Sequence, residues 1–322
     1  MNGIMKKTVM GMINLNSDTL DLRENIIQIT TVGIGSSGEQ ILKNLPSSYQ
    51  SQIKKIRIDH SYHENISTAL SDTDMLIIVM NLKDVDSDDL QNLLTEIATE
   101  SPYSLSVLVA VQPQSYLSCS EEAALEQILL QENNLFDAIL LISEEKAKLS
   151  KISAADVAKN FISTLISFVL KRGKVGFDFS DLCAILKKSG YISVGFGSAK
   201  GENCINNAVN AVLADPLLGI SLIHAKGVLI HISGPDTISL DEYEKISDKI
   251  ASQTNEATCI AWNMFLNGSL MDEIRVSVTV TGFEDDMDFQ SYLEQSKSAD
   301  SDDVFKDITK IFNKNPQETP PF

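Results

Sequence analysis

Short apolar runs alternate with amphipathic helical segments along the first half of the chain, and this alternation constrains the fold more than any other feature. The runs 74–80 and 106–111 are almost continuously apolar, and 26–34 is rich in residues that favour strands. Strands of that kind are buried on both faces, and helical segments between them are typical of parallel sheets. The first half therefore predicts an α/β domain with a doubly wound parallel sheet, and further strands are expected at 54–59 and 136–143.

A long helix is predicted over about 153–170, and it is apolar around most of its circumference. Such a helix has little surface suited to water, so we expect it to be buried between two domains. The last two predicted strands, 258–266 and 272–283, flank the turn residues Asn267-Gly268-Ser269. We expect these strands to be neighbours joined by a tight connection in a second, mixed α+β domain.

The expected organisation has five parts. They are an N-terminal extension (1–25), the doubly wound domain (26–150), the central helix (151–175), the second domain (176–283), and an acidic linker with an amphipathic tail (284–322). The linker is rich in Ser and acidic residues and cannot bury enough apolar area to offset its ordering entropy. The apolar face of 303–313 suits either a groove on a partner or the chain's own domain.

The charge balance limits the partners. The formal net charge is -18, and so acidic a surface disfavours binding to nucleic acid and direct binding to anionic membranes. No apolar run approaches the roughly 18 residues of a membrane span. The four cysteines are scattered without a C-x-x-C pair, which is typical of reduced thiols, so we expect a cytoplasmic location.

A glycine turn stands between the first predicted strand and its helix. It reads VGIGSSG over 32–38, with Ser36 and Ser37 between the glycines Gly33, Gly35 and Gly38. Glycines at this place let backbone N–H groups at a helix N-terminus hold a phosphate. A tight strand-to-helix turn without a ligand explains the same glycines equally well.

Three segments of the second half match the FtsZ family in order and spacing. They are GFDFSDLCAILKKSGYISVGFGSAKGENCINNAVNAVLADPLLG, AKGVLIHISGPDTISLDEYEKI and SLMDEIRVSVTVTGF, all within 176–283. VGIGSSG, DMLIIVM and VAVQP in the first half align more weakly. Over about 26–283 the chain thus resembles a divergent member of the FtsZ/tubulin superfamily. The resemblance implies a GTPase-like α/β domain, a long central helix and a second domain with a mixed sheet.

In FtsZ, loops of the first domain hold GTP. The resemblance places 33–38 on the phosphate loop and Asp156 on the acidic residue that hydrogen-bonds the guanine edge. An acidic residue at a helix start also interacts favourably with the helix dipole, which is the alternative role of Asp156.

The neighbouring subunit of an FtsZ filament supplies acidic residues that activate the attacking water. The resemblance places Asp178 and Asp181 on these residues, and we expect them to be vestigial. Their alternative roles are a turn acid and an N-cap for the following helix.

Several departures from the family bear on GTP. The family's signature loop GGGTGTG is replaced by NLKDVDSDD over 81–89, with no glycine and four aspartates. Phosphate loops need glycine, and uncompensated carboxylates repel a triphosphate, although Mg²⁺ could bridge them. The glycine-rich stretch that closes over the γ-phosphate is also reduced, the inter-subunit asparagine is Gly176, and VQPQSYL lacks the family's arginine.

These departures predict a non-catalytic FtsZ-like protein that binds no cofactor and acts through protein–protein contacts. Its partner would be FtsZ, another FtsZ-like protein or a second copy. The alternative is a residual, self-polymerising GTPase that uses GTP and Mg²⁺, with metal held by Asp84, Asp86, Asp88 or Asp89. His60 and His63 with Glu64 have helical ligand spacing, but no other His or Cys is near in sequence, so we predict no metal site there.

Overall fold

The computed structural model describes residues 27–58, 66–84, 93–98, 103–113, 135–170 and 178–282. The chain divides into two units, 1–282 and 283–322. All structural statements below concern the first unit. The expected linker and tail, Gly176, His60, His63, Glu64, Asp86, Asp88 and Asp89 lie outside the described residues.

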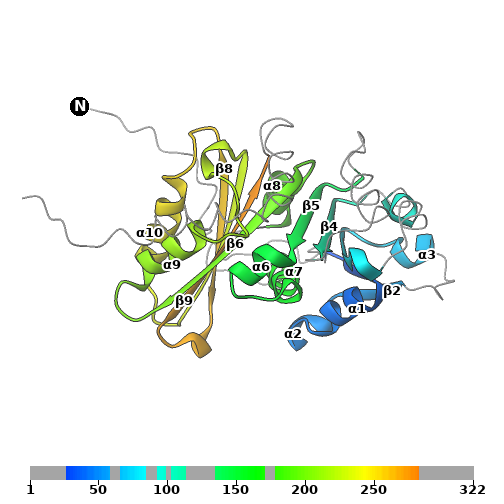
Figure 1. Cartoon of the computed structure of the whole chain (residues 1–322), viewed down its shortest axis with the longest axis horizontal. Coiled ribbons are helices and arrows are strands. Elements are labelled where there is room, and N and C mark those ends of the chain that lie inside the picture. Colours follow the sequence, from blue (N-terminus) through cyan, green and yellow to red (C-terminus); the bar gives the residue numbers. More distant parts are fainter. Residues whose placement is uncertain are drawn as a thin grey trace, which may run out of the picture. The chain divides into compact units, whose positions relative to one another are not determined.

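The described strands form one nine-stranded sheet in the order β2-β1-β3-β4-β5-β6-β9-β7-β8 (Figure 1). The strands are β1 (Ile29–Ile34), β2 (Lys54–Ile58), β3 (Met75–Asn81), β4 (Leu105–Gln112), β5 (Ala138–Ser143), β6 (Gly190–Lys200), β7 (Gly227–Gly234), β8 (Cys259–Leu266) and β9 (Glu273–Thr281). The helices are α1 (Gly35–Lys43), α2 (Ser47–Gln50), α3 (Ile66–Leu70), α6 (Glu144–Leu149), α7 (Ala154–Leu170), α8 (Phe179–Leu186), α9 (Cys204–Leu213) and α10 (Leu240–Ala251). The short 3₁₀ segments are η1 (Leu82–Asp84), η2 (Leu222–His224) and η3 (Gly268–Leu270).

The first half of the sheet is parallel, as predicted. Every neighbouring pair from β2 through to β6 runs in the same direction. All side chains from Met75 to Met80 in β3 are 0% exposed, so both faces of this strand are covered. The near-continuous apolar runs in the sequence therefore correspond to fully buried parallel strands.

The second half of the sheet is mixed. Strand β9 pairs antiparallel with both β6 and β7, while β7 and β8 are parallel. The prediction that β8 and β9 are neighbours was wrong, because β7 lies between them. Helix α10 connects β7 to β8 in a parallel crossover, and the turn at η3 then passes the end of β7 to reach its other side.

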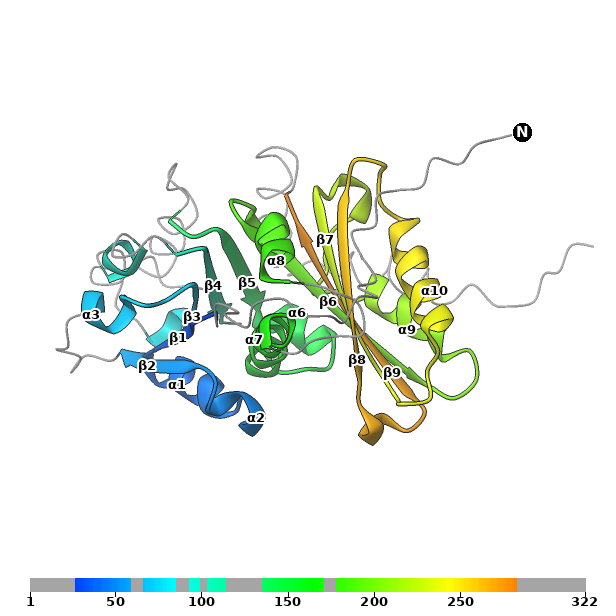
Figure 2. The same cartoon turned by 180° about the vertical axis from the view of Figure 1, so that it is seen from behind.

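Helix α7 is the central helix expected from its broadly apolar sequence. Ten of its 17 residues are buried. The eight apolar ones among them share one cluster with buried residues of β4 and β5 and with residues of the second half such as Leu182 and Leu229. Figure 2 shows α7 beside β5, with α9 and α10 on the far side of β6–β9. Its burial is as predicted, and its place between two separate domains stays a prediction.

Candidate functional site

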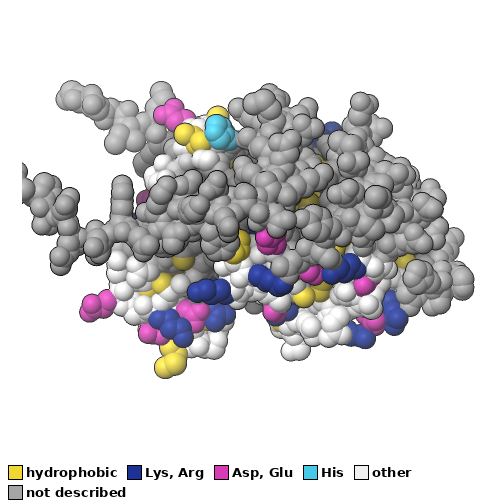
Figure 3. Space-filling model, viewed as in Figure 1, with side chains coloured by type: hydrophobic (Ala, Val, Ile, Leu, Met, Phe, Trp, Pro, Cys, Tyr) yellow, Lys and Arg dark blue, Asp and Glu magenta, His cyan; other side chains and the backbone are white. Residues whose placement is uncertain are grey.

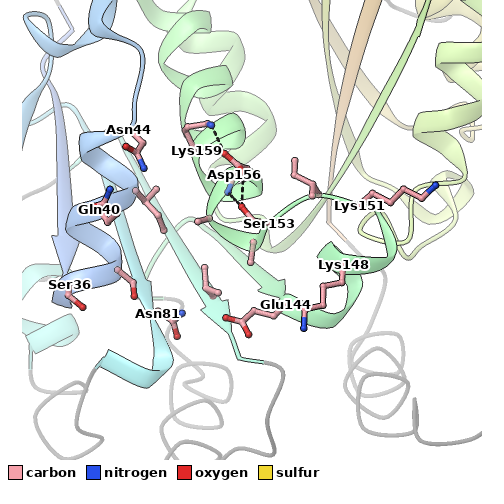
Figure 4. A pocket seen from close by; sticks show the side chains of 16 residues that line it. Ser36, Gln40, Asn44, Asn81, Glu144, Lys148, Lys151, Ser153, Asp156 and Lys159 are labelled. Carbon is pink, nitrogen blue, oxygen red and sulfur yellow. Dashed lines mark hydrogen bonds and ion pairs between the residues drawn. The ribbon is translucent and has the colours of Figure 1, made fainter.

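A cavity of about 950 Å³ opens where α1 and α7 begin, at the carboxyl ends of the parallel strands (Figure 4). Ligands of open α/β sheets bind at this edge. Gln40 of α1 and Asn44, the residue after this helix, face Asp156 and Lys159 of α7 across the cavity. The polar lining comprises Ser36, Ser37, Gln40, Asn44, Asn81, Glu144, Lys148, Lys151, Ser153, Asp156 and Lys159.

The glycine turn is built by close packing. A Cβ at Gly38 would lie 2.4 Å from the carbonyl oxygen of Val79, and one at Gly33 would lie 2.9 Å from the backbone of Gly38. Gly35 has a φ of +71°, which L side chains rarely adopt. Each glycine is therefore required by the approach of α1 to the sheet, whether or not a ligand binds.

The N-terminus of α1 carries an internal carboxylate. Its N-cap, Ile34, makes no side-chain cap hydrogen bond, and the first turn has no acidic residue. The backbone N–H of Ser37 instead donates to Asp84 Oδ2 at 2.6 Å, and the Ser36 hydroxyl donates to the same oxygen at 3.1 Å. An acceptor with negative charge thus occupies the position at which a helix N-terminus holds a phosphate oxygen.

Asp84 reaches this position through the turn that follows β3. The Asn81 side chain accepts a hydrogen bond from the N–H of Lys83 at 3.0 Å, and Leu82 is buried at 3% exposure. The sequence pointed to Asp84 only as a source of repulsion or as a possible metal ligand. The lack of a capping residue before Gly35 was the signal that α1 needs an acceptor from elsewhere.

Asp156 lies in the first turn of α7 and lines the cavity. Its carboxylate accepts hydrogen bonds from Lys159 Nζ at 2.5 Å and from the Ser153 hydroxyl at 2.7 Å. These two hydrogen bonds, that of Lys159 first, lower the pKa of Asp156. Ser153 Oγ also caps the Asp156 N–H, so Asp156 belongs to a local helix-start arrangement. Its implied contact with guanine stays a prediction.

Asp178 and Asp181 lie together at the start of α8 and form a reciprocal capping box. The Asp181 N–H donates to Asp178 Oδ1 and the Asp178 N–H donates to Asp181 Oδ2, both at 3.0 Å. The hydrogen bond from Ser180 is the main cause that lowers the pKa of Asp178. Neither aspartate lines the cavity. The geometry has the N-cap arrangement that the sequence offered as an alternative, and a role toward a neighbouring subunit stays a prediction.

Within the part of the chain that the structure describes, no group of three or more His, Cys, Asp or Glu side chains could hold a metal ion. Over the same residues, no helix is long and apolar enough to cross a lipid bilayer. On the face in Figure 3, Lys and Arg side chains are mixed with Asp and Glu along the lower edge.

Comparison with known proteins gives consistent matches. The sequence profile of the FtsZ family, C-terminal domain, matches residues 190–284. "Cell division protein FtsZ" of Wigglesworthia glossinidia brevipalpis is 26% identical over 279 residues, covering 83% of this chain and 71% of that protein.

Two solved structures share the fold. "FtsZ dimer, empty (M. jannaschii)" superposes with a TM-score of 0.64 at 20% identity, covering 81% of this chain and 90% of that one. "CetZ2 from Haloferax volcanii - GTPgS bound protofilament" gives a TM-score of 0.61 at 14% identity, covering 84% and 98%.

Proposed function

Because the chain belongs to the FtsZ/tubulin superfamily, we propose that it is a non-catalytic member that acts through protein–protein contacts. In this proposal it regulates or caps FtsZ-type filaments in cell division and binds no nucleotide. Its partner is an FtsZ, another FtsZ-like chain or a second copy of itself, in the cytoplasm. Because the chain has a net charge of -18, nucleic acid and anionic membranes are poor partners for it.

One observation carries the loss of nucleotide binding. The Asp84 carboxylate accepts the Ser37 N–H at 2.6 Å, and this N–H is one of the donors that a bound phosphate would need. A phosphate placed there would meet a second negative charge and would have to displace a charge-assisted hydrogen bond. Asp156 supports the same proposal, because Ser153 and Lys159 already donate to its carboxylate.

The second half of the chain supports a role in contacts. It contains the whole family match at 190–284, and relatives of this fold were solved as a dimer and as protofilaments. The capping box of Asp178 and Asp181 fixes the start of α8 and leaves polar side chains at the surface. By analogy, we propose that this end docks onto the cavity face of a like-folded partner.

Binding of labelled GTP to the purified full chain, with Mg²⁺, tests the first half of the proposal. We expect no saturable binding up to about 100 μM GTP and no turnover above buffer, a limit that corresponds to less than about 5–6 kcal/mol of binding free energy. An FtsZ from the same cell serves as the positive control. Micromolar binding with turnover that Asp178→Ala abolishes would show that the chain is a GTPase.

Co-sedimentation with FtsZ filaments tests the contact. We expect the chain to change the amount of sedimented FtsZ, and we expect Asp178→Ala to weaken this effect. Ser239→Ala is the matched control, because Ser239 also forms a capping box, with Glu242 at the start of α10. Equal loss in both variants would mean that helix stability, and not the α8 end, governs the effect.

The alternative, a residual self-polymerising GTPase, is favoured by the retained cavity of about 950 Å³ and its lysines. It requires Asp84 to leave the Ser37 N–H when GTP binds. Light scattering of the isolated chain with GTP and Mg²⁺ separates the two functions, since only the alternative gives nucleotide-dependent filaments.

A further inference from the structure

Helix α1 takes its N-terminal acceptor from a residue 47 positions away in the sequence. Other helices are capped locally, such as α6 by Ser143, α8 by Asp178 and α10 by Ser239. The N-cap of α1 is Ile34, which offers no acceptor side chain. Helix α1 is nine residues long and begins directly after β1. It needs such an acceptor, since its first N–H groups have no partner within the helix.

We propose that Asp84 acts as a built-in ligand, whose carboxylate replaces an external phosphate at α1, closes that position to other anions and stabilises the ligand-free fold. This inference rests on the proposed function in one respect, namely that the chain works without a nucleotide. It adds that the Asp84 carboxylate itself stabilises α1 in place of a ligand. The contact is therefore an autoinhibitory one with respect to anion binding.

Asp84 engages the donors that an anion at the start of α1 would use. One oxygen, Oδ2, accepts from both the Ser37 N–H and the Ser36 hydroxyl. The Asp84 Cβ lies only 2.6 Å from the point where a Gly35 Cβ would be, so the side chain is packed directly on the turn. An external oxyanion and the Asp84 carboxylate thus compete for the same donors.

The position of Asp84 is set by the sheet and not by a long loop. It follows β3 by three residues, and Val79 and Met80 at the end of β3 are 0% exposed. Leu82 is buried between them and Asp84, and the Asn81 side chain fixes the turn. Because these anchors are buried or hydrogen-bonded, the carboxylate is held at α1 at little further cost in ordering entropy.

Thermal unfolding of the full chain and of Asp84→Ala tests the inference. Loss of an N-cap acceptor should lower the Tm of Asp84→Ala by roughly 2–5 °C. Asp84→Asn keeps an uncharged acceptor, so its Tm should lie between those of Asp84→Ala and the unchanged chain. Asp72→Ala is the matched control, because Asp72 is an exposed aspartate on the turn before β3, and its Tm should stay within about 1 °C of the unchanged chain.

Inorganic phosphate supplies the specific measurement. At 50 mM phosphate, compared with chloride of equal ionic strength, we expect the Tm of Asp84→Ala to rise by roughly 2–4 °C, while the unchanged chain and Asp72→Ala respond by less than about 1 °C. Hydrogen exchange of the peptide 35–43 should be faster in Asp84→Ala and should slow again with phosphate. A variant that is merely less well packed would lose stability without this rescue.

The outcomes are separable. Equal Tm values for Asp84→Ala and the unchanged chain, or an equal phosphate response in both, overturn the inference. Should Asp84→Ala fail to fold, the same phosphate comparison in Asp84→Asn decides it. GTP binding by the unchanged chain would defeat the proposed function. Absence of binding in the unchanged chain together with no phosphate response in either Asp84 variant would defeat only the built-in ligand.

Discussion

Lys159 lies one helical turn after Asp156 on α7, and its ammonium nitrogen is 2.5 Å from Asp156 Oδ1. The Ser153 hydroxyl donates to the other oxygen at 2.7 Å. All three residues line the same cavity as Ser36 and Ser37. One internal pair, within α7, thus lies on the cavity wall, and Asp84 pairs with Ser36 and Ser37, which line the same cavity.

Lys159→Met should weaken the start of α7. We expect a loss of about 0.3–0.5 kcal/mol in the free energy of unfolding at pH 7, because the pair is half exposed. Hydrogen bonds from Lys159 and Ser153 lower the pKa of Asp156 below 3.8 in the folded state. The contribution of the carboxylate is thus complete above about pH 4 and is lost as the pH falls through the folded-state pKa.

Urea unfolding between pH 2.5 and 7 measures this difference. The gap between Lys159→Met and the unchanged chain should narrow below about pH 4 as Asp156 becomes protonated. Lys245→Met, an exposed lysine substitution on α10, controls for the loss of a surface charge. A gap that stays constant down to pH 2.5 would mean that Lys159 acts through packing and not through Asp156.

Local patterns predicted the parallel half of the fold well. The run from Met75 to Met80 is fully buried in β3, and the broadly apolar α7 is buried on most of its surface. The pairing of β8 and β9 was predicted wrongly, because a tight turn shows only that two strands are close in sequence. Which strand lies between them depends on the crossover through α10, and no residue of the turn encodes it.

In the site, too, local features could be predicted from the sequence and a long-range contact could not. The capping box of Asp178 and Asp181 is local, since the two residues are three positions apart, and the sequence offered it as an interpretation. The glycine turn was also located correctly, at the start of α1. The lack of a capping residue before Gly35 indicated that α1 needs a distant acceptor, but capping rules consider neighbours in sequence and do not identify Asp84, which follows a distant strand end.

A buried carboxylate joins the turn before α7 to the second half of the sheet. Asp215 is 8% exposed and accepts the Phe196 N–H at 2.6 Å, the Leu217 N–H at 3.1 Å and the Ser150 hydroxyl. Asp215→Ala leaves these donors without their acceptor, so we expect a loss of about 2–4 kcal/mol in the free energy of unfolding. Ser150→Ala should cost only about 1 kcal/mol.

Chemical denaturation of both variants checks this order, with the exposed α10 aspartate variant Asp248→Ala as the control expected within about 0.5 kcal/mol of the unchanged chain. If Asp215→Ala were no less stable than Ser150→Ala, the two backbone hydrogen bonds would contribute nothing measurable.

Gly38 should be indispensable even in a chain that binds no nucleotide. A Cβ there would lie 2.4 Å from the Val79 carbonyl oxygen, so Gly38→Ala must push α1 away from β3. We expect a loss of more than about 2 kcal/mol, by analogy with overpacked cores. Gly201→Ala is the comparison, since Gly201 has a φ of +70° but open space around it. Gly201→Ala should therefore lose only about 1 kcal/mol in the free energy of unfolding, from backbone strain. Unfolding without any ligand measures both, and equal losses would argue against the packing role of the turn glycine.

Lys146 on α6 should destabilise the fold at neutral pH. Burial lowers the pKa of Lys146 to about 8, although Glu145 opposes the shift. Since the unfolded-state pKa is 10.5, the unfolded chain binds the proton more strongly, and stability should rise between about pH 8 and 10.5. Lys146→Met removes the cost of burying the ammonium, so we expect about 1–2 kcal/mol more stability at pH 7, fading toward pH 10.5. Unfolding of both chains from pH 7 to 10.5, with Lys245→Met as the exposed control, checks the sign. An advantage that persists at pH 10.5 would assign the gain to apolar packing of Met rather than to the lost charge.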